Sequence, residues 1–352
     1  MSNSGGGEAP PSESQGVVNL LAAELRAKSL HHQLSLSGVS DEMGKAFFPL
    51  IKKALKDGDY QEAYVQYAVA RSFEVKIPQK LRDYIRQNLL DRITYNFGNI
   101  ENVYPMKLYI EMGFDPNWQH PRSKINIINF AVLSRSLDWL KYLVEEAGID
   151  PNTQDGTGST PAFIALVTSQ LPMLEYLVEE AGIDPNTQHR NGDTLTKTAI
   201  KKGNLPMLRY LRDRGADIML GYSNGTTPFL LAAAELKFNI VEELYEEFGV
   251  NSTDNHGNTA LHYASRSPIT MYYEDIVRFL VDHGADINKQ NDRKQTPFWL
   301  AVKHSKTKED AQLLIDLGAD TTIPGLSDDG SLTTPKQEAF LGHNYLLSEL
   351  LS

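Results

Sequence analysis

Two short segments contain residue types that could act on a substrate. His31 and His32 are adjacent, and a neutral imidazole can bind a metal or take up a proton. The segment GTGST at 156–160 could cradle a phosphate with its backbone N–H groups. However, HHQLS is not the HExxH of a zinc helix, and GTGST lacks the lysine and the preceding strand of a phosphate loop. We therefore expect surface histidines at the first segment and an ordinary turn at the second.

Paired carboxylates occur in the phrase EEAG, at 145–146 and again at 179–180. Two acids can share the work of proton transfer only when a second acid or base lies within reach of the same atom. No residue at a matching spacing supplies that partner, so the glutamates are assigned to a solvated helix face. We predict no catalytic residue, no cofactor and no metal site.

The elements that would position any site repeat along the chain. The segment YLVEEAGIDPNTQ occurs at 142–154 and again at 176–188, and weaker copies end in a glycine. These glycines, spaced 33 to 35 residues apart, are Gly113, Gly148, Gly182, Gly215, Gly249, Gly284 and Gly318. Glycine can adopt the left-handed conformation that ends a helix, and the Asp-Pro-Asn of several copies prevents its continuation. Each interval therefore predicts one repeated helical unit.

A helix start stands about 22 residues before most of these glycines. The starts share a threonine, and they are Thr160, Thr194, Thr227, Thr259 and Thr296, followed by Thr334 near the end. Threonine caps a helix with its side-chain oxygen, and the proline that often follows suits the first turn, where its missing N–H is not needed. Each unit is predicted to run turn, helix, short loop, helix, glycine stop.

The motif TPxxxA, the period of 33–34 residues and the ending GADIN resemble the ankyrin-repeat family, and TALH at 259–262 is close to the TPLH of that family. The resemblance covers about 104–351 and implies an all-α solenoid of helix pairs joined by short hairpin loops. It also implies that His262 ties adjacent turns together. Two copies depart from the pattern, because NIINFA at Asn126 lacks both Thr and Pro and Trp299 stands where histidine is usual.

The first hundred residues lie outside this resemblance. Residues 1–15 are rich in Gly, Ser, Pro and Glu and are predicted to be a disordered tail. Residues 16–103 have apolar residues at helical spacing, which predicts a helical region that caps the repeats of the domain 104–351. Three tyrosines on one face of such a helix are predicted to pack in the core: Tyr60, Tyr64 and Tyr67.

The composition excludes several classes of protein. The 352 residues have a net charge of −11, which argues against a general nucleic-acid binder. The absence of cysteine rules out disulfides, Cys-ligated zinc and a thiol nucleophile, and it fits a reducing compartment. No apolar run approaches the length that spans a bilayer, and the N-terminus lacks the pattern of a secretory signal. We expect a cytoplasmic monomer with no membrane or nucleic-acid partner.

The resemblance places the binding surface on the concave side, formed by the hairpin tips and the exposed side of the first helices. Counted from each threonine, tip positions lie one to six residues before it and exposed helix positions seven to eight after it. These positions include Asp193 and Asn255 but collect mainly basic residues, namely Arg190, Lys201, Lys202, His256, Arg266, Arg293, Lys294, Lys303 and His304. The acidic residues otherwise fall away from the groove, because the paired glutamates belong to second helices on the outer face. A basic groove predicts an acidic or phosphorylated segment of a partner protein as ligand. The alternative is a chance alignment of solvated charges.

Aromatic residues could add apolar contact to this groove. Trp118 follows an Asp-Pro-Asn stop and Tyr222 takes a hairpin-tip position, and exposed Trp and Tyr often dominate interfaces. Trp139 and Trp299 fall at packing positions and are predicted to be core. The fifth full repeat has three extra residues, which place Tyr272 and Tyr273 on the edge opposite the hairpins, where a second, smaller surface is expected.

The sequence as a whole favours a scaffold or adaptor that binds a partner protein in its groove and catalyses nothing, either in a eukaryotic cytosol or as a bacterial effector in a host cell. The alternative is an enzyme with its active site in the helical N-terminal region and repeats that recruit substrate. A closed helical cap would favour the scaffold. A polar cleft with converging His, Asp or Glu side chains would favour the enzyme.

Overall fold

The computed structural model describes residues 39–72, 75–95, 104–113, 115, 119, 124–220, 222–267, 271–304 and 307–342. The chain divides into two compact units, Met1–Asp150 and Pro151–Ser352, and each is described by itself. The predicted tail 1–15, His31 and His32 lie outside the described residues.

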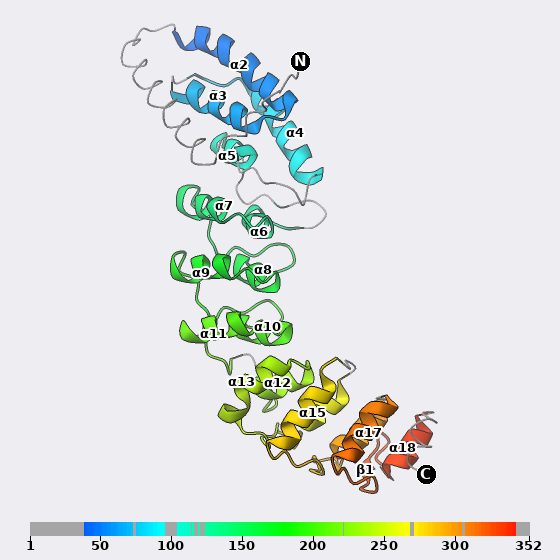
Figure 1. Cartoon of the computed structure of the whole chain (residues 1–352). Coiled ribbons are helices and arrows are strands. Elements are labelled where there is room, and N and C mark those ends of the chain that lie inside the picture. Colours follow the sequence, from blue (N-terminus) through cyan, green and yellow to red (C-terminus); the bar gives the residue numbers. More distant parts are fainter. Residues whose placement is uncertain are drawn as a thin grey trace, which may run out of the picture. The chain divides into compact units, whose positions relative to one another are not determined.

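The first helices that the structure describes in this unit (Figure 1) are α2 (Val39–Asp57), α3 (Tyr60–Ser72), α4 (Gln79–Tyr95) and α5 (Tyr104–Glu111). The turn from α2 to α3 uses Gly58, which has a φ of +80°. The carboxylate of Asp59 then accepts the N–H of Glu62 at 3.0 Å and so caps α3. Helices α3 and α4 each contact both α2 and α5, so these helices share one core.

The tyrosine stripe of α3 lies in that core. Tyr60, Tyr64 and Tyr67 are all buried. Two of these tyrosines are bound to α5, because the Tyr64 hydroxyl donates to Oε1 of Glu111 at 2.6 Å and the Tyr67 hydroxyl donates to the carbonyl of Glu111 at 2.8 Å. Buried tyrosines need such partners for their hydroxyls. The predicted packing role is confirmed.

The first unit also contains one divergent helix pair, α6 (Ile127–Leu133) followed by α7 (Leu137–Lys141) and the π-helical η1 (Tyr142–Glu146). Asn126 replaces the usual threonine, and its side chain accepts the N–H of Asn129 at 2.9 Å. Trp139 is fully buried and meets Phe130 edge-on, with ring centroids 5.5 Å apart. The predicted start at Asn126 and the core position of Trp139 are confirmed.

In the second unit, helix pairs follow one another along the chain (Figure 1). The first helices are α8 (Pro161–Val167), α10 (Leu195–Lys202), α12 (Pro228–Ala234), α14 (Ala260–Arg266), α16 (Pro297–Lys303) and α18 (Pro335–Leu341). The second helices are α9 (Leu171–Glu179), α11 (Leu205–Asp213), α13 (Phe238–Phe248), α15 (Tyr273–Asp282) and α17 (Lys308–Asp316). A small hairpin, β1 (Gly325–Leu326) with β2 (Leu332–Thr333), precedes α18. The predicted all-α class is confirmed.

Local chemistry sets both ends of these repeats. Each first helix begins directly after a predicted threonine, as at Thr194, whose hydroxyl accepts the N–H of Lys197 at 3.1 Å. The glycine stops adopt the left-handed conformation, with φ of +71° at Gly182 and +82° at Gly215. The predicted helix boundaries are therefore confirmed.

Successive first helices of this unit contact one another in chain order from α8 to α18, and two buried side chains bridge neighbouring repeats. His262 accepts the N–H of Thr259 at Nδ1 (3.1 Å) and donates from Nε2 to the carbonyl of Gln295 (3.0 Å). Trp299 donates from Nε1 to the carbonyl of Thr333 at 3.0 Å. Both carbonyls belong to the residue just before the next capping threonine. Trp299 therefore makes the bond that His262 makes one repeat earlier.

Candidate partner-binding site

The layer of first helices presents one position repeatedly. Lys201, Arg266 and Lys303 each lie seven residues after a capping threonine, on α10, α14 and α16. Because helices in equivalent positions of stacked repeats expose the same side, these three residues belong to one face of the layer. The hairpin tips that precede each helix border that face.

Five of the predicted contact residues line one cleft of about 390 Å³ in the second unit. They come from the tips before α14 and α16 and from the C-terminal ends of those helices: His256, Arg266, Arg293, Lys303 and His304. The cleft also receives the carboxylates of Asp292 and Asp328. It therefore combines a cluster of cationic groups with two acids.

The tips that bear His256 and Arg293 have the same construction. The carboxylate of Asp254 accepts the N–H of His256 at 2.9 Å, and the side-chain oxygen of Asn291 accepts the N–H of Arg293 at 3.0 Å. The two tips are also joined, because the N–H of Asp292 donates to the carbonyl of His256 at 2.9 Å. Side-chain acceptors of this kind fix tight turns. His256 and Arg293 thus lie at the edge of the cleft on loops that are fixed by hydrogen bonds.

The positive charges of the cleft are partly neutralised by an acid that also lines it. Lys303 Nζ lies 2.6 Å from Oδ1 of Asp328, and Arg293 Nη1 lies 3.7 Å from the same oxygen. Arg266 is exposed and forms no ion pair with any residue that the structure describes. Burial lowers the pKa of His304, and the nearby charges of Arg266 and Lys303 lower it further. Burial thus has the largest effect on this imidazole, and the two neighbouring cations act in the same direction.

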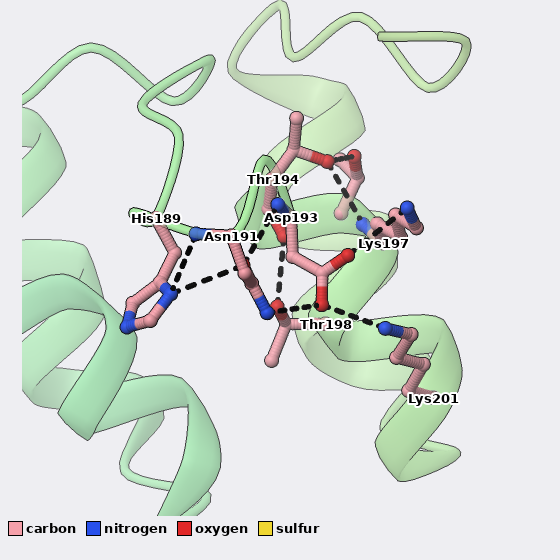
Figure 2. Close-up of polar contacts among 8 residues, drawn as sticks. His189, Asn191, Asp193, Thr194, Lys197, Thr198 and Lys201 are labelled. Carbon is pink, nitrogen blue, oxygen red and sulfur yellow. Dashed lines mark hydrogen bonds and ion pairs between the residues drawn. The ribbon is translucent and has the colours of Figure 1, made fainter. Parts of the chain in front are cut away.

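A second cluster surrounds Asp193, at the tip before α10 (Figure 2). Its carboxylate lies 3.0 Å from Lys197 Nζ and 2.6 Å from Lys201 Nζ. Burial alone would raise the pKa of Asp193, but hydrogen bonds from Lys201 and Lys197 hold it below its usual value. Lys197 Nζ also lies 5.4 Å from the ring centre of Tyr222. Lys197 and Lys201 are therefore already paired with Asp193.

Tyr222 is less accessible to a partner protein than its tip position predicted. Its hydroxyl is buried and has no hydrogen-bond partner among the described residues. Burial, followed by the charge of Asp193, raises its pKa. The ring packs beside Lys197 and does not line the basic cleft.

The remaining predicted contact residues are scattered. Arg190 is exposed and packs over Gly158, where a Cβ would come within 2.7 Å of its Nε. Lys294 is exposed at its tip with a φ of +58° but does not line the cleft. Lys202 lines another hollow, at the turns between helices, together with Tyr272. The surface position predicted for Tyr273 is wrong, because its side chain is fully buried at the start of α15. Trp118 lies outside the described residues.

A family model described as "Ankyrin repeats (3 copies)" matches residues 95–189, 128–221, 195–291 and 231–325 of this chain. Together these matches cover more than half of the sequence. The chain belongs to the ankyrin-repeat family.

Individual relatives share shorter segments with this ankyrin-repeat protein. The neurogenic locus notch homolog protein 1 of Homo sapiens is 34% identical over 91 residues, which is 26% of this chain and 3% of that protein. The protein of the same name from Xenopus tropicalis gives the same figures. The ankyrin repeat protein OPG189 of Variola virus is 31% identical over 94 residues, which is 26% of this chain and 16% of that protein. The chain thus matches only a small part of each relative.

The outer face of the ankyrin repeats differs from the prediction of an acidic surface. Arginines of α11 pair with glutamates of the next repeat, as in Arg209 with Glu243 at 2.5 Å and Arg212 with Glu247 at 2.7 Å. Arg214 pairs with Glu179 of the preceding repeat at 2.6 Å. Because the partners lie 34 or 35 residues apart in sequence, the periodicity of a single helix does not reveal them. The outer face therefore carries positive and negative side chains that form ion pairs between neighbouring repeats.

The expectation that acids lie away from the ankyrin groove is wrong for Asp292 and Asp328. Both line the basic cleft. Asp292 lies four residues before Thr296 and Asp328 six before Thr334, so the tip rule applied to both threonines would have found them.

Within the described ranges, no three His, Asp or Glu side chains gather as they would around a metal ion. No helix in those ranges is both long enough and apolar enough to cross a membrane.

Proposed function

We propose that this ankyrin-repeat protein is an interaction scaffold that binds a segment of a partner protein in the basic cleft. One observation carries the proposal: five basic or imidazole side chains from two tips and two helix ends converge on one hollow, and Arg266 among them has no described ion-pair partner. Such a site attracts anionic oxygens through charge-assisted hydrogen bonds and long-range fields. The ligand is therefore an acidic or phosphorylated segment.

The other predicted contacts have secondary roles in this proposal. Arg190 and Lys294 are exposed at tips and can extend the contact along the groove. Lys201 is held by Asp193, and Tyr222 is largely enclosed, so neither is assigned a leading role. The proposal places the protein in the cytoplasm as a monomer. None of the relatives named above is bacterial, and the proposal does not extend to a role as a bacterial effector.

The scaffold is favoured over an enzyme by the N-terminal helices. In their described part, polar side chains bind one another: Tyr64, Tyr67 and Arg71 all contact Glu111, with Arg71 Nη1 at 3.3 Å. Arg82 donates to the carbonyl of Met112 at 2.8 Å. These bonds hold the helices together and support a structural role for 16–103 as a cap of the repeat domain 104–351.

Photo-crosslinking tests where the partner binds. A photoreactive phenylalanine analogue replaces His256 in one variant and Glu242 in another, both exposed, on the cleft side and on the second helix α13 respectively. After irradiation in a cell lysate, a discrete partner should be linked to the cleft variant and lost when Arg266→Glu is added. Crosslinking of the same protein from position 242 alone would contradict the proposal.

A further inference from the structure

The hairpin before α18 presents an acid to the basic cleft. Its turn is closed by the N–H of Ser327 donating to the carbonyl of Ser331 at 2.8 Å, and Gly330 has the φ of +82° that the turn requires. The carboxylate of Asp329 is used within the turn, where it accepts the N–H (2.9 Å) and hydroxyl (2.6 Å) of Ser331. Asp328, by contrast, reaches out of the turn to Lys303.

This hairpin is fixed to the preceding tip by several hydrogen bonds. The N–H of Leu326 donates to the carbonyl of Arg293 at 2.9 Å, and the Arg293 guanidinium donates to the carbonyl of Ser327 at 2.6 Å. The side-chain amide of Gln295 donates to the carbonyl of Leu326 at 2.6 Å. The backbone therefore holds Asp328 at the edge of the cleft.

The contact of Asp328 itself is easily exchanged. Its side chain is 77% exposed while it lies on Lys303, whose own side chain is only 16% exposed. An ion pair with one solvated partner contributes little stability. The cation is thus built into the cleft, whereas the anion can be replaced by another carboxylate from solution.

We propose that Asp328 is an internal competitor that occupies the place of a partner carboxylate on Lys303 and Arg293. This inference rests on the proposed function of the cleft. A partner with one isolated acid would only exchange its carboxylate for that of Asp328. A partner with two neighbouring acidic residues gains a second contact, at Arg266. The ankyrin cleft therefore selects segments with at least two closely spaced Asp or Glu side chains.

The test uses the full chain and a fluorescein-labelled peptide that alternates glutamate and serine, with binding measured by fluorescence anisotropy. Asp328→Asn should bind this peptide about two- to fivefold more tightly than the wild type, the range that loss of an exposed ion pair allows. Asp292→Asn is the matched control, because it removes the same charge from the same cleft and Asp292 forms no ion pair with a described residue. Its affinity should change less.

Equal tightening by both substitutions would overturn the inference, because the cleft would then respond only to net charge. No tightening by Asp328→Asn would overturn it as well, as would a phosphoserine peptide that binds where the glutamate peptide does not. Failure of the wild type to bind either peptide would refute the proposed function itself.

A measurement without ligand separates these failures. Asp328 raises the pKa of His304, so Asp328→Asn should lower that pKa in an NMR titration of the free protein. An unmoved His304 pKa would show that Asp328 does not occupy the cleft, whatever the peptides do.

Discussion

Replacing Trp299 with alanine should lower the free energy of unfolding by about 4 kcal/mol. The indole is fully buried, and it lies so close to Gly325 that a Cβ there would come within 3.1 Å of the ring. Its Nε1 donates to the carbonyl of Thr333 at 3.0 Å, across to the next repeat. Truncation would leave a cavity and an unsatisfied carbonyl between two neighbouring repeats, and the interface between these repeats would be weakened.

Urea denaturation followed by far-UV circular dichroism measures this effect. Trp299→Phe is the control, because it keeps an aromatic ring and most of the volume but removes the hydrogen bond, at an expected cost of about 1–2 kcal/mol. If the alanine variant loses no more stability than the phenylalanine variant, Trp299 does not join the repeats in the way that the geometry indicates.

Lowering the pH from 6.5 to 4 should remove about 3 kcal/mol of stability through His262 alone. Burial lowers the pKa of this imidazole from 6.5 to about 4, and its Nδ1 is already occupied as the acceptor of the Thr259 N–H. Between these two pH values the unfolded chain binds a proton that the folded chain does not. The free energy of unfolding must therefore fall as the pH falls.

The variant His262→Gln isolates this contribution. Glutamine can accept the same capping bond from Thr259 but does not titrate. The variant should be less stable than the wild type at pH 7, and its denaturation midpoint should depend much less on pH between 6.5 and 4. A slope equal to that of the wild type would show that another group carries the dependence.

The helix boundaries of the ankyrin repeats could be predicted because they depend on local chemistry. A threonine such as Thr194 caps its helix with its own hydroxyl, and a glycine such as Gly182 ends one through its own φ. Asn126 could be placed by spacing alone, since its side chain performs the same capping. In each case the deciding interaction lies within four residues.

The repeated segment YLVEEAGIDPNTQ shows that local sequence alone does not determine the secondary structure everywhere. Its first copy contains the π-helical η1, whereas the second copy continues the α-helix α9. Identical residues cannot encode this difference, so their neighbours must. Tyr142 lies under Lys107 Nζ of α5 at 4.4 Å, a neighbour that the repeat pattern does not contain. Sequence periodicity could not predict this.

For the candidate site, the positions of some residues could be predicted, but their ion-pair partners could not. The position seven residues after each threonine correctly placed Arg266 and Lys303 in one cleft. The partner of each charge could not be predicted, because the pairs Lys303–Asp328 and Arg209–Glu243 join residues of successive repeats. Lys202, one position further along its helix, lines another hollow beside Tyr272. His304 holds the same position after Thr296 and does line the cleft, so spacing from the threonine alone does not decide which of these side chains reach it.

The central claim is that the partner binds the cleft side of the ankyrin repeats through charge. The most direct measurement is the association rate of a captured partner with two single variants, Arg266→Glu and Lys308→Glu. Both replaced residues are exposed and neither forms an ion pair with a described residue, so both variants should fold and carry the same charge change. Lys308 begins the second helix α17 and does not line the cleft.

Arg266→Glu should slow association about tenfold at low salt and weaken its salt dependence. Lys308→Glu should leave the rate nearly unchanged. If Lys308→Glu slows association and Arg266→Glu does not, the partner binds the second-helix side and the cleft is not the binding site.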